Sequence, residues 1–207
     1  MRNIYIAFAF MLVGSVASFA QNTNPKKDYL ITINTDLGAI ELVLFDVTPK
    51  HKDNFLTLTQ RGFYNGTTFH RIIKDFMIQG GDTLSKDDNT QNDGTGTLGY
   101  TIPAEFVDTL THNRGMLAAA RMGDGMNPTR ASSSCQFYIV QAKNGTHFLD
   151  KQYTVFGKVI KGMDVVDAIA LLPKDARDRP LKEVKMTVKA TLMKRKKIAK
   201  RMLLENK

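Results

Sequence analysis

The stretch that most restricts the fold of this chain is FHRIIKDFMIQGGD at residues 69–82, in which two short β-prone runs flank a polar break. Side chains alternate between the two faces of a strand, so Phe69, Arg71 and Ile73 are predicted to share one face. The polar break turns the chain back, and a glycine pair ends the second run. Arg71 and Gln79 are therefore predicted to meet across two adjacent strands, beside an apolar patch that suits a neutral, ring-shaped substrate.

Short strands dominate the rest of the chain, with two helices among them. One helix is predicted to begin at Thr48, with Pro49 in its first turn, and to end at Gly62. A second is predicted over 163–172, where apolar residues recur at helical spacing before Pro173. Further strands are predicted from apolar or alternating runs at 29–34, 39–45, 155–160 and 184–192. This pattern indicates a mainly β fold, a closed antiparallel barrel with two helices.

The stretch at 69–82 also resembles the signature of the cyclophilins, the peptidyl-prolyl cis/trans isomerases, in nearly every residue. Four more stretches follow in that family's order: GTGTLGYTIPAEF at 94–106, GMLAAAR at 115–121, SSCQFYI at 133–139 and FLDKQYTVFGKVIKGMDVV at 148–166. The resemblance covers about residues 28–190. It implies a closed eight-stranded antiparallel barrel capped by two α-helices, whose packed interior leaves the active groove on the outer wall.

The activity implied by the resemblance is rotation about X-Pro amides, which needs no cofactor. Resonance sets a rotational barrier of about 18 to 20 kcal/mol, and a twisted amide offers a basic nitrogen that the planar ground state lacks. A donor aimed at that nitrogen acts only on the transition state, and Arg71 is the candidate catalytic donor. Gln79 is expected to accept one guanidinium N–H bond and fix its direction. A carboxylate in that place would draw Arg71 away.

The resemblance also implies the residues of the substrate groove, carried over one by one from its motifs. The proline ring is assigned to Phe76, Met77, Tyr138 and Leu149, and the rest of the groove to Ala120, Arg121, Gln136, Phe148 and Tyr153. Ala120 and Arg121 lie where the family pairs its backbone with an extended peptide, and Phe137 is expected on the core side of its strand. Phe148 stands where many relatives have Trp, so cyclosporin is expected to bind weakly. The loop at 122–134 is longer than in compact relatives, which leaves substrate preference open.

Residues 1–20 are typical of a secretory signal peptide. A basic residue precedes the apolar run at 4–13, and Ser18-Phe19-Ala20 gives a small-x-small cleavage site before Gln21. The alternative is an uncleaved membrane anchor, although the run is short for a bilayer span. No cysteine follows the cleavage site for lipid attachment. The segment at 21–27 is expected to be flexible, and the mature protein is predicted to be an exported, bacterial-like family member, periplasmic or secreted.

A single domain is predicted over 28–193, followed by a basic tail at 194–207. The tail holds seven basic residues and one acid, which gives +6 of the formal charge of +9. Ile198, Met202 and Leu203 recur in it at helical spacing. Two alternatives stay open: a frayed terminus, or an amphipathic helix that touches anionic membrane surfaces or acidic clients. Nucleic acid is not expected as a partner, because the tail lacks interleaved aromatic residues for base stacking.

The remaining constellations carry no chemistry of their own. The four histidines lack the close spacing of metal ligands, so no metal site is expected. Cys135, the one cysteine, is expected to be a buried small hydrophobe. A monomeric isomerase acting on folding or unfolded exported proteins is therefore the first hypothesis. The second is a non-catalytic module or holdase chaperone that binds proline segments or acidic clients. The retained Arg71 and Gln79 favour the enzyme, since a pure binder needs no oriented cation.

Overall fold

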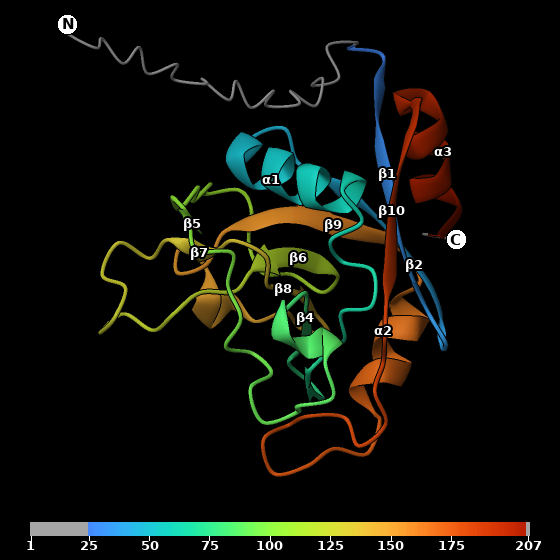
Figure 1. Ribbon diagram of the computed structural model, residues 1–207. Coiled ribbons are helices and arrows are strands. Elements are labelled where there is room, and N and C mark those ends of the chain that lie inside the picture. The colour runs from blue at the N-terminus through green and yellow to red at the C-terminus, as the bar shows by residue number, and fades with distance from the viewer. Residues whose placement is uncertain (1–24, 206–207) are drawn as a thin grey trace, which may run out of the picture.

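A computed structural model describes residues 25–205. The signal peptide predicted at 1–20, and most of the segment predicted to be flexible at 21–27, lie outside the described residues. One antiparallel sheet of eight strands dominates the fold, in the order β10-β1-β2-β9-β6-β8-β4-β3 (Figure 1). Its strands are β1 (Lys27–Thr35), β2 (Gly38–Leu44), β3 (Arg71–Ile73), β4 (Met77–Gly80), β6 (Met116–Ala119), β8 (Phe137–Val140), β9 (Val155–Lys161) and β10 (Thr187–Lys194).

The remaining elements are short. They are the two-stranded sheet β5 (Thr101–Ile102) and β7 (Ser132–Ser133), the 3₁₀ turns η1 (Leu84–Lys86) and η2 (His147–Leu149), and the helices α1 (Pro49–Gln60), α2 (Met163–Ala170) and α3 (Arg195–Glu205). The two predicted helices appear as α1 and α2, and residues 25–205 contain a third α-helix. The third forms in the segment predicted as a basic tail.

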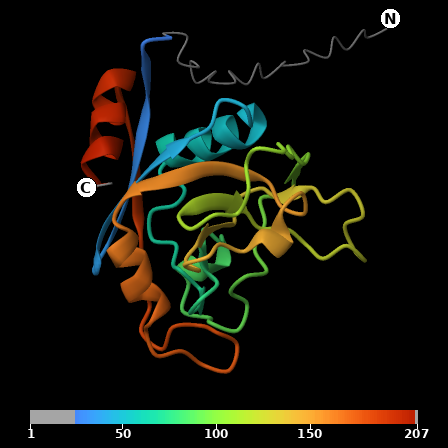
Figure 2. The same ribbon diagram turned by 180° about the vertical axis from the view of Figure 1, so that it is seen from behind.

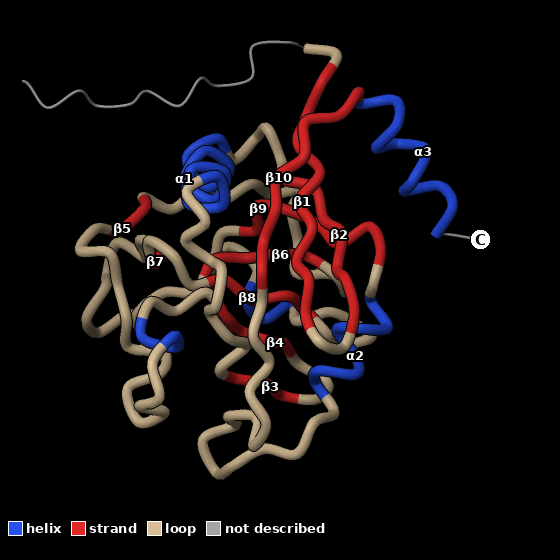
Figure 3. Tube along the Cα trace, turned by 45° about the vertical axis from the view of Figure 1, so that its right-hand side comes forward, coloured by secondary structure: helices blue, strands red, loops and turns tan. Residues whose placement is uncertain are grey.

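Backbone hydrogen bonds join segments near the two outer strands of the sheet. Phe69 N–H donates to Val184 O at 3.0 Å, and Met186 N–H donates to Thr67 O at 2.8 Å. Figure 3 shows the chain leading into β10 passing close to β3 and β4. The eight antiparallel strands are as predicted, whereas the closure of the sheet into a barrel stays a prediction.

The local sequence explains where these elements begin and end. Gly38 closes the β1–β2 hairpin at φ +134°, a conformation that favours glycine. Helix α1 carries Pro49 at its start and ends just before Gly62, whose φ is +69°. Helix α2 ends at Ala170, two residues earlier than predicted, because Leu171 forms its C-cap.

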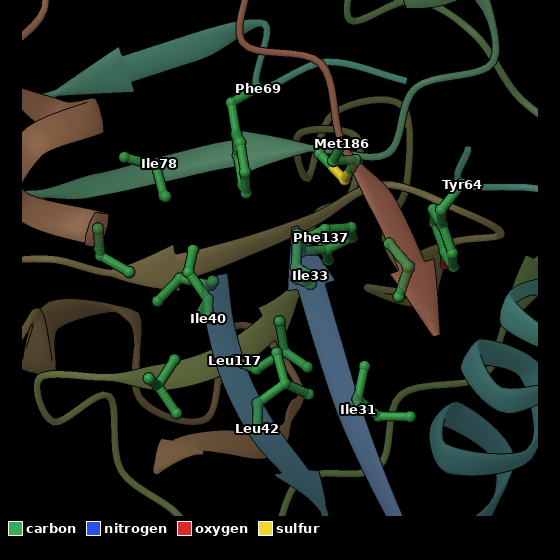
Figure 4. Packing of buried hydrophobic residues seen from close by; sticks show 14 of the residues in the cluster. Ile31, Ile33, Ile40, Leu42, Tyr64, Phe69, Ile78, Leu117, Phe137 and Met186 are labelled. Carbon is green, nitrogen blue, oxygen red and sulfur yellow. The ribbon is translucent and has the colours of Figure 1, made fainter. Parts of the chain in front are cut away.

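The main core lies between the sheet and helices α1 and α2. Figure 4 shows Phe69, Ile78 and Phe137 converging with side chains from β1 and β2. Phe69 is 1% exposed and Ile72 is fully buried, and both belong to this core. The prediction that Phe69 and Arg71 share a face is wrong, because β3 begins only at Arg71 and strand alternation does not extend back to Phe69. Phe137 is on the core side, as predicted.

A second apolar cluster covers the opposite face of β4, β6 and β8. It contains the buried residues Met77, Ala118, Tyr138, Val140, Ala142 and Val155, with Phe76, Leu149 and Tyr153 packed against it. Adjacent residues of β8 thus serve different faces, with Phe137 in the core and Tyr138 in the second cluster. This outer cluster is where the predicted proline seat lies.

Helix α3 packs beside β1 and β10 and does not extend into solvent (Figures 1 and 2). Ile198 is 5% exposed and packs with Leu30 and Ile160. Met202 contacts the same cluster, and Arg201 forms an ion pair with Glu41. Of the predicted apolar stripe, Ile198 and Met202 therefore pack against the protein itself, whereas Leu203 is 68% exposed.

Candidate active site

The register of β3 and β4 places the two predicted catalytic side chains side by side. Arg71 pairs with Gln79 in the antiparallel ladder, which confirms the prediction that they meet across adjacent strands. Both line a pocket of about 140 Å³. The pocket is lined by Arg71, Phe76, Met77, Gln79, Ala120, Arg121, Tyr138, Leu149 and Tyr153. These are all the predicted site residues except Gln136 and Phe148.

The floor of the pocket is apolar and firmly packed. Met77 is 2% and Tyr138 is 4% exposed, and Leu149 packs against them from the turn η2. Phe148, predicted to contact substrate, does not line the pocket and is 73% exposed. Its ring stacks on that of Phe76, with centroids 5.8 Å apart and planes inclined by 24°. Phe148 therefore supports the rim through Phe76, because it projects outward from the short turn η2.

The hydrogen bond predicted from Arg71 to Gln79 is not what the side chains form. The Gln79 amide donates to Gln136 Oε1 at 3.0 Å. The amide N–H groups of Gln136 donate to Gly94 O and Gly96 O, each at 3.0 Å. The Gln136 side-chain oxygen can then only accept, and Gln79 supplies its donor. Gln136 is 7% exposed and lies behind the pocket wall, where it holds Gln79 in place.

A carboxylate from a distant part of the sequence also lies near Arg71. Asp178 Oδ2 is 3.9 Å from Arg71 Nε, and the arginine side chain is 42% exposed. Sequence reasoning missed Asp178, because it is far from the 69–82 stretch and stands in a loop without a motif. Long-range contacts of this kind leave no local signal in a single sequence.

A histidine and an aspartate hold the Tyr138 ring from behind. Asp150 Oδ1 lies 2.8 Å from His112 Nδ1, and the Tyr138 hydroxyl lies 2.9 Å from His112 Nε2. Burial lowers the pKa of His112 despite the neighbouring carboxylate. A neutral ring with its proton on Nδ1 donates to Asp150 and accepts from the tyrosine hydroxyl. The network fixes one wall of the proline seat, and the spacing of histidines in the sequence gave no sign of it.

Arg121 and Ala120 form the opposite wall, with a structural role visible for each. The Arg121 guanidinium lies over the Tyr153 ring at 4.4 Å from its centroid, and its Nε donates to Gln152 O at 2.8 Å. Ala120 N–H donates to Gln136 O, and Ala120 O accepts from Ser133. Both backbone groups of Ala120 therefore already have partners within the protein, and the peptide pairing expected at Ala120 and Arg121 stays a prediction.

A family model and the curated relatives of this chain agree on one protein family. Residues 30–190 match the family described as cyclophilin type peptidyl-prolyl cis-trans isomerase. Peptidyl-prolyl cis-trans isomerase CYP18-1 of Arabidopsis thaliana is 42% identical over 158 residues, which are 75% of this chain and 91% of that protein. The chain belongs to the cyclophilin family. Peptidyl-prolyl cis-trans isomerase-like 3 of Gallus gallus is 40% identical over 74% of this cyclophilin and 90% of its own length.

Solved structures agree with this assignment. A Cryptosporidium parvum cyclophilin type peptidyl-prolyl cis-trans isomerase has a TM-score of 0.68 and 28% identity, over 79% of this cyclophilin and 98% of that chain. The same parasite protein was also solved in the presence of the dipeptide Ala-Pro. This cyclophilin is a peptidyl-prolyl cis/trans isomerase. These three relatives are eukaryotic proteins and give no support to a bacterial-like, exported placement.

Three further features of the chain were predicted or tested from its sequence: metal sites, membrane-spanning helices and the one cysteine. Within residues 25–205 of this cyclophilin, no three His, Cys, Asp or Glu side chains come together in a way that would hold a metal ion. No helix in that range is long and apolar enough to cross a membrane. Cys135 is 3% exposed and packs in the main core, as predicted, and burial raises the pKa of its thiol.

Proposed function

We propose that this cyclophilin accelerates X-Pro rotation by donating a hydrogen bond from Arg71 to the twisted amide. The observation that carries the proposal is that the Arg71 side chain lines the same small pocket as Phe76, Met77 and Leu149. A proline ring seated on these apolar residues brings its own nitrogen under the guanidinium. Arginine stays protonated at all relevant pH values, so the donor is always present.

The magnitudes are consistent with an isomerase that binds clients loosely. Lowering the rotational barrier by about 5 to 6 kcal/mol raises the rate by roughly four orders of magnitude. One preorganised positive charge, in a pocket from which water is partly excluded, can stabilise the transition state by this amount. Burying one proline ring yields about 1 to 2 kcal/mol at about 25 cal/mol per Å². Peptide affinity is therefore weak and client choice broad.

Proline-containing peptides are the proposed ligands. The relative solved in the presence of Ala-Pro supports this, because its chain matches most of this cyclophilin. The seat is tested by Leu149→Ala, which removes apolar surface from the pocket wall. An Ala-Pro-Phe peptide titrated by NMR is expected to bind about threefold to tenfold more weakly than to wild type.

The matched control for this test is Leu181→Ala, because Leu181 is 70% exposed and lies outside the pocket lining. Its peptide affinity is expected to equal that of wild type. Equal affinities for all three proteins would place the proline ring elsewhere.

Exported proteins are the proposed clients, in the periplasm or outside the cell. The support is the apolar run and the small-x-small site within residues 1–20. Mass spectrometry of the protein purified from its native cells is expected to find an N-terminus at Gln21. A purified protein that still begins at Met1 would contradict the proposal.

Weak contact with an anionic membrane surface is proposed for the polar face of α3. Its apolar stripe is buried through Ile198, so the contact is electrostatic and uses the exposed Lys196, Lys197 and Lys200. Changing these three lysines to Gln is expected to reduce adhesion to anionic vesicles at low salt and to leave isomerisation unchanged. Equal adhesion by both proteins would exclude the contact.

A further inference from the structure

We propose that Asp178 is the positioning residue for Arg71, in the role expected of Gln79. The inference rests on the catalytic role proposed for Arg71. Its starting observation is the 3.9 Å between Asp178 Oδ2 and Arg71 Nε, with the carboxylate 32% exposed. The Gln79 amide N–H group donates to Gln136, and Gln79 makes no side-chain hydrogen bond with Arg71 within residues 25–205, so the ion pair with Asp178 is the contact that restrains the guanidinium there.

The loop that carries Asp178 is docked on the edge of β3 next to Arg71. Ile72 N–H donates to Asp178 O at 2.8 Å. Lys174 Nζ donates to Ile72 O at 3.2 Å and to Asp178 Oδ1 at 2.7 Å. The loop thereby satisfies the outward N–H and C=O groups of an edge strand, and it ties the carboxylate to the backbone of the residue that follows the catalytic arginine.

The shape of the loop is itself fixed by hydrogen bonds. Asp175 Oδ1 accepts from the backbone N–H groups of Arg177 and Arg179, at 2.8 and 2.9 Å. The Arg179 guanidinium binds Asp93 at 2.6 Å, which anchors the loop to a neighbouring one. Asp178 adopts φ +64°, a left-handed conformation that Asp and Asn tolerate better than most residues. Asp178 is thus held in place, by its contacts with β3 and by the hydrogen bonds that fix its loop, before any peptide binds.

The position of the carboxylate indicates how it acts. It faces Nε, which leaves the two terminal amino groups of Arg71 to donate into the pocket. At 3.9 Å the attraction is electrostatic, without a short hydrogen bond that would have to break when the guanidinium shifts toward the prolyl nitrogen. Lys174 shares the negative charge, so Asp178 restrains the direction of Arg71 without cancelling its charge at the site.

The test is Asp178→Asn, which keeps the size of the side chain and tolerates the left-handed backbone. We expect kcat/KM for an Ala-Pro peptide to fall about twofold to fivefold through kcat, as for the loss of one partly exposed ion pair, with peptide Kd unchanged. Asp175→Asn is the matched control, since it lies in the same loop and keeps the oxygen that accepts both N–H groups. Its kcat is expected to equal that of wild type.

Two further readouts separate positioning from a structural effect. In an Arg71→Ala background, Asp178→Asn is expected to cause no additional loss of exchange. By NMR, the Arg71 Nε–H signal is expected to shift and its order parameter to fall in Asp178→Asn but not in Asp175→Asn. An unchanged kcat, or the same loss with and without Arg71, would overturn the inference. If Arg71→Ala alone retains wild-type exchange, it is the catalytic proposal that fails.

Discussion

At the scale of single residues, the Tyr138 hydroxyl shows how a substrate wall depends on a buried polar partner. It is the donor that satisfies His112 Nε2, while Asp150 accepts a hydrogen bond from the N–H group of the other ring nitrogen. Both His112 and Tyr138 are almost fully buried, so water cannot replace the missing partner. A buried acceptor that has no hydrogen-bond donor destabilises the folded state by most of the free energy it costs to remove that acceptor from water.

Tyr138→Phe is therefore expected to lower the free energy of unfolding by about 1 to 3 kcal/mol, because it leaves His112 Nε2 without a donor. Urea denaturation followed by circular dichroism measures the change. Tyr153→Phe serves as the control, since its ring makes an edge-to-face contact with Tyr138 and a cation–π contact with Arg121, neither of which depends on the hydroxyl. Equal stability of Tyr138→Phe and wild type would mean that the hydroxyl does not serve His112.

The same scale shows what a single sequence can and cannot predict about a site. Alternation and a polar break sufficed to place Arg71 opposite Gln79, since both follow from local strand geometry. The partner of Gln79 did not follow, because Gln136 is brought there by the pairing of β4 with β8. Asp178 was missed for the same reason. The apolar seat was implied by family motifs and not by periodicity, which cannot separate core from groove.

At the scale of elements, α3 is the helix that the sequence left open. Its apolar positions recur at helical spacing, yet eleven residues rich in lysine and arginine are marginal as an isolated helix. Packing of Ile198 against Leu30 and Ile160 supplies the stability that the segment lacks alone. The strands at 29–34 and 39–45 were predictable because their apolar runs and turn residues are local signals, and they appear as β1 and β2.

Ile198→Ala is expected to destabilise the protein by about 2 to 4 kcal/mol, because it opens a cavity under a helix with few other apolar contacts. Leu203→Ala is the matched control, with a parent side chain that is 68% exposed. Thermal unfolding of the two variants checks the difference. Equal melting temperatures would show that α3 does not pack on the sheet as described.

At the scale of the whole molecule, three buried histidines link stability to pH. Burial lowers the pKa of His51, His70 and His112 in the folded protein. The unfolded chain therefore binds more protons below about pH 6.5, the usual histidine value, and stability falls as the pH drops from there. Both ring nitrogens of His70 are buried without a hydrogen-bond partner, so no hydrogen bond within residues 25–205 favours its charged form.

The free energy of unfolding is expected to decrease between pH 7 and pH 5, by up to about 1.4 kcal/mol per pH unit for each histidine that stays neutral in the fold. Denaturant titrations at several pH values measure the slope. Replacing His112 by Gln is expected to reduce it. A flat profile over this range would mean that the three folded pKa values are not lowered.

The central claim is that the Arg71 cation stabilises the twisted amide and contributes little to ground-state binding. NMR exchange spectroscopy on an Ala-Pro-Phe peptide, with wild type and Arg71→Ala each at saturating concentration, reports the cis/trans rate of the bound peptide and its Kd in one titration. The account predicts a bound-state rate at least about 100-fold lower for Arg71→Ala, with Kd changed less than about threefold. A bound-state rate equal to that of wild type would contradict it.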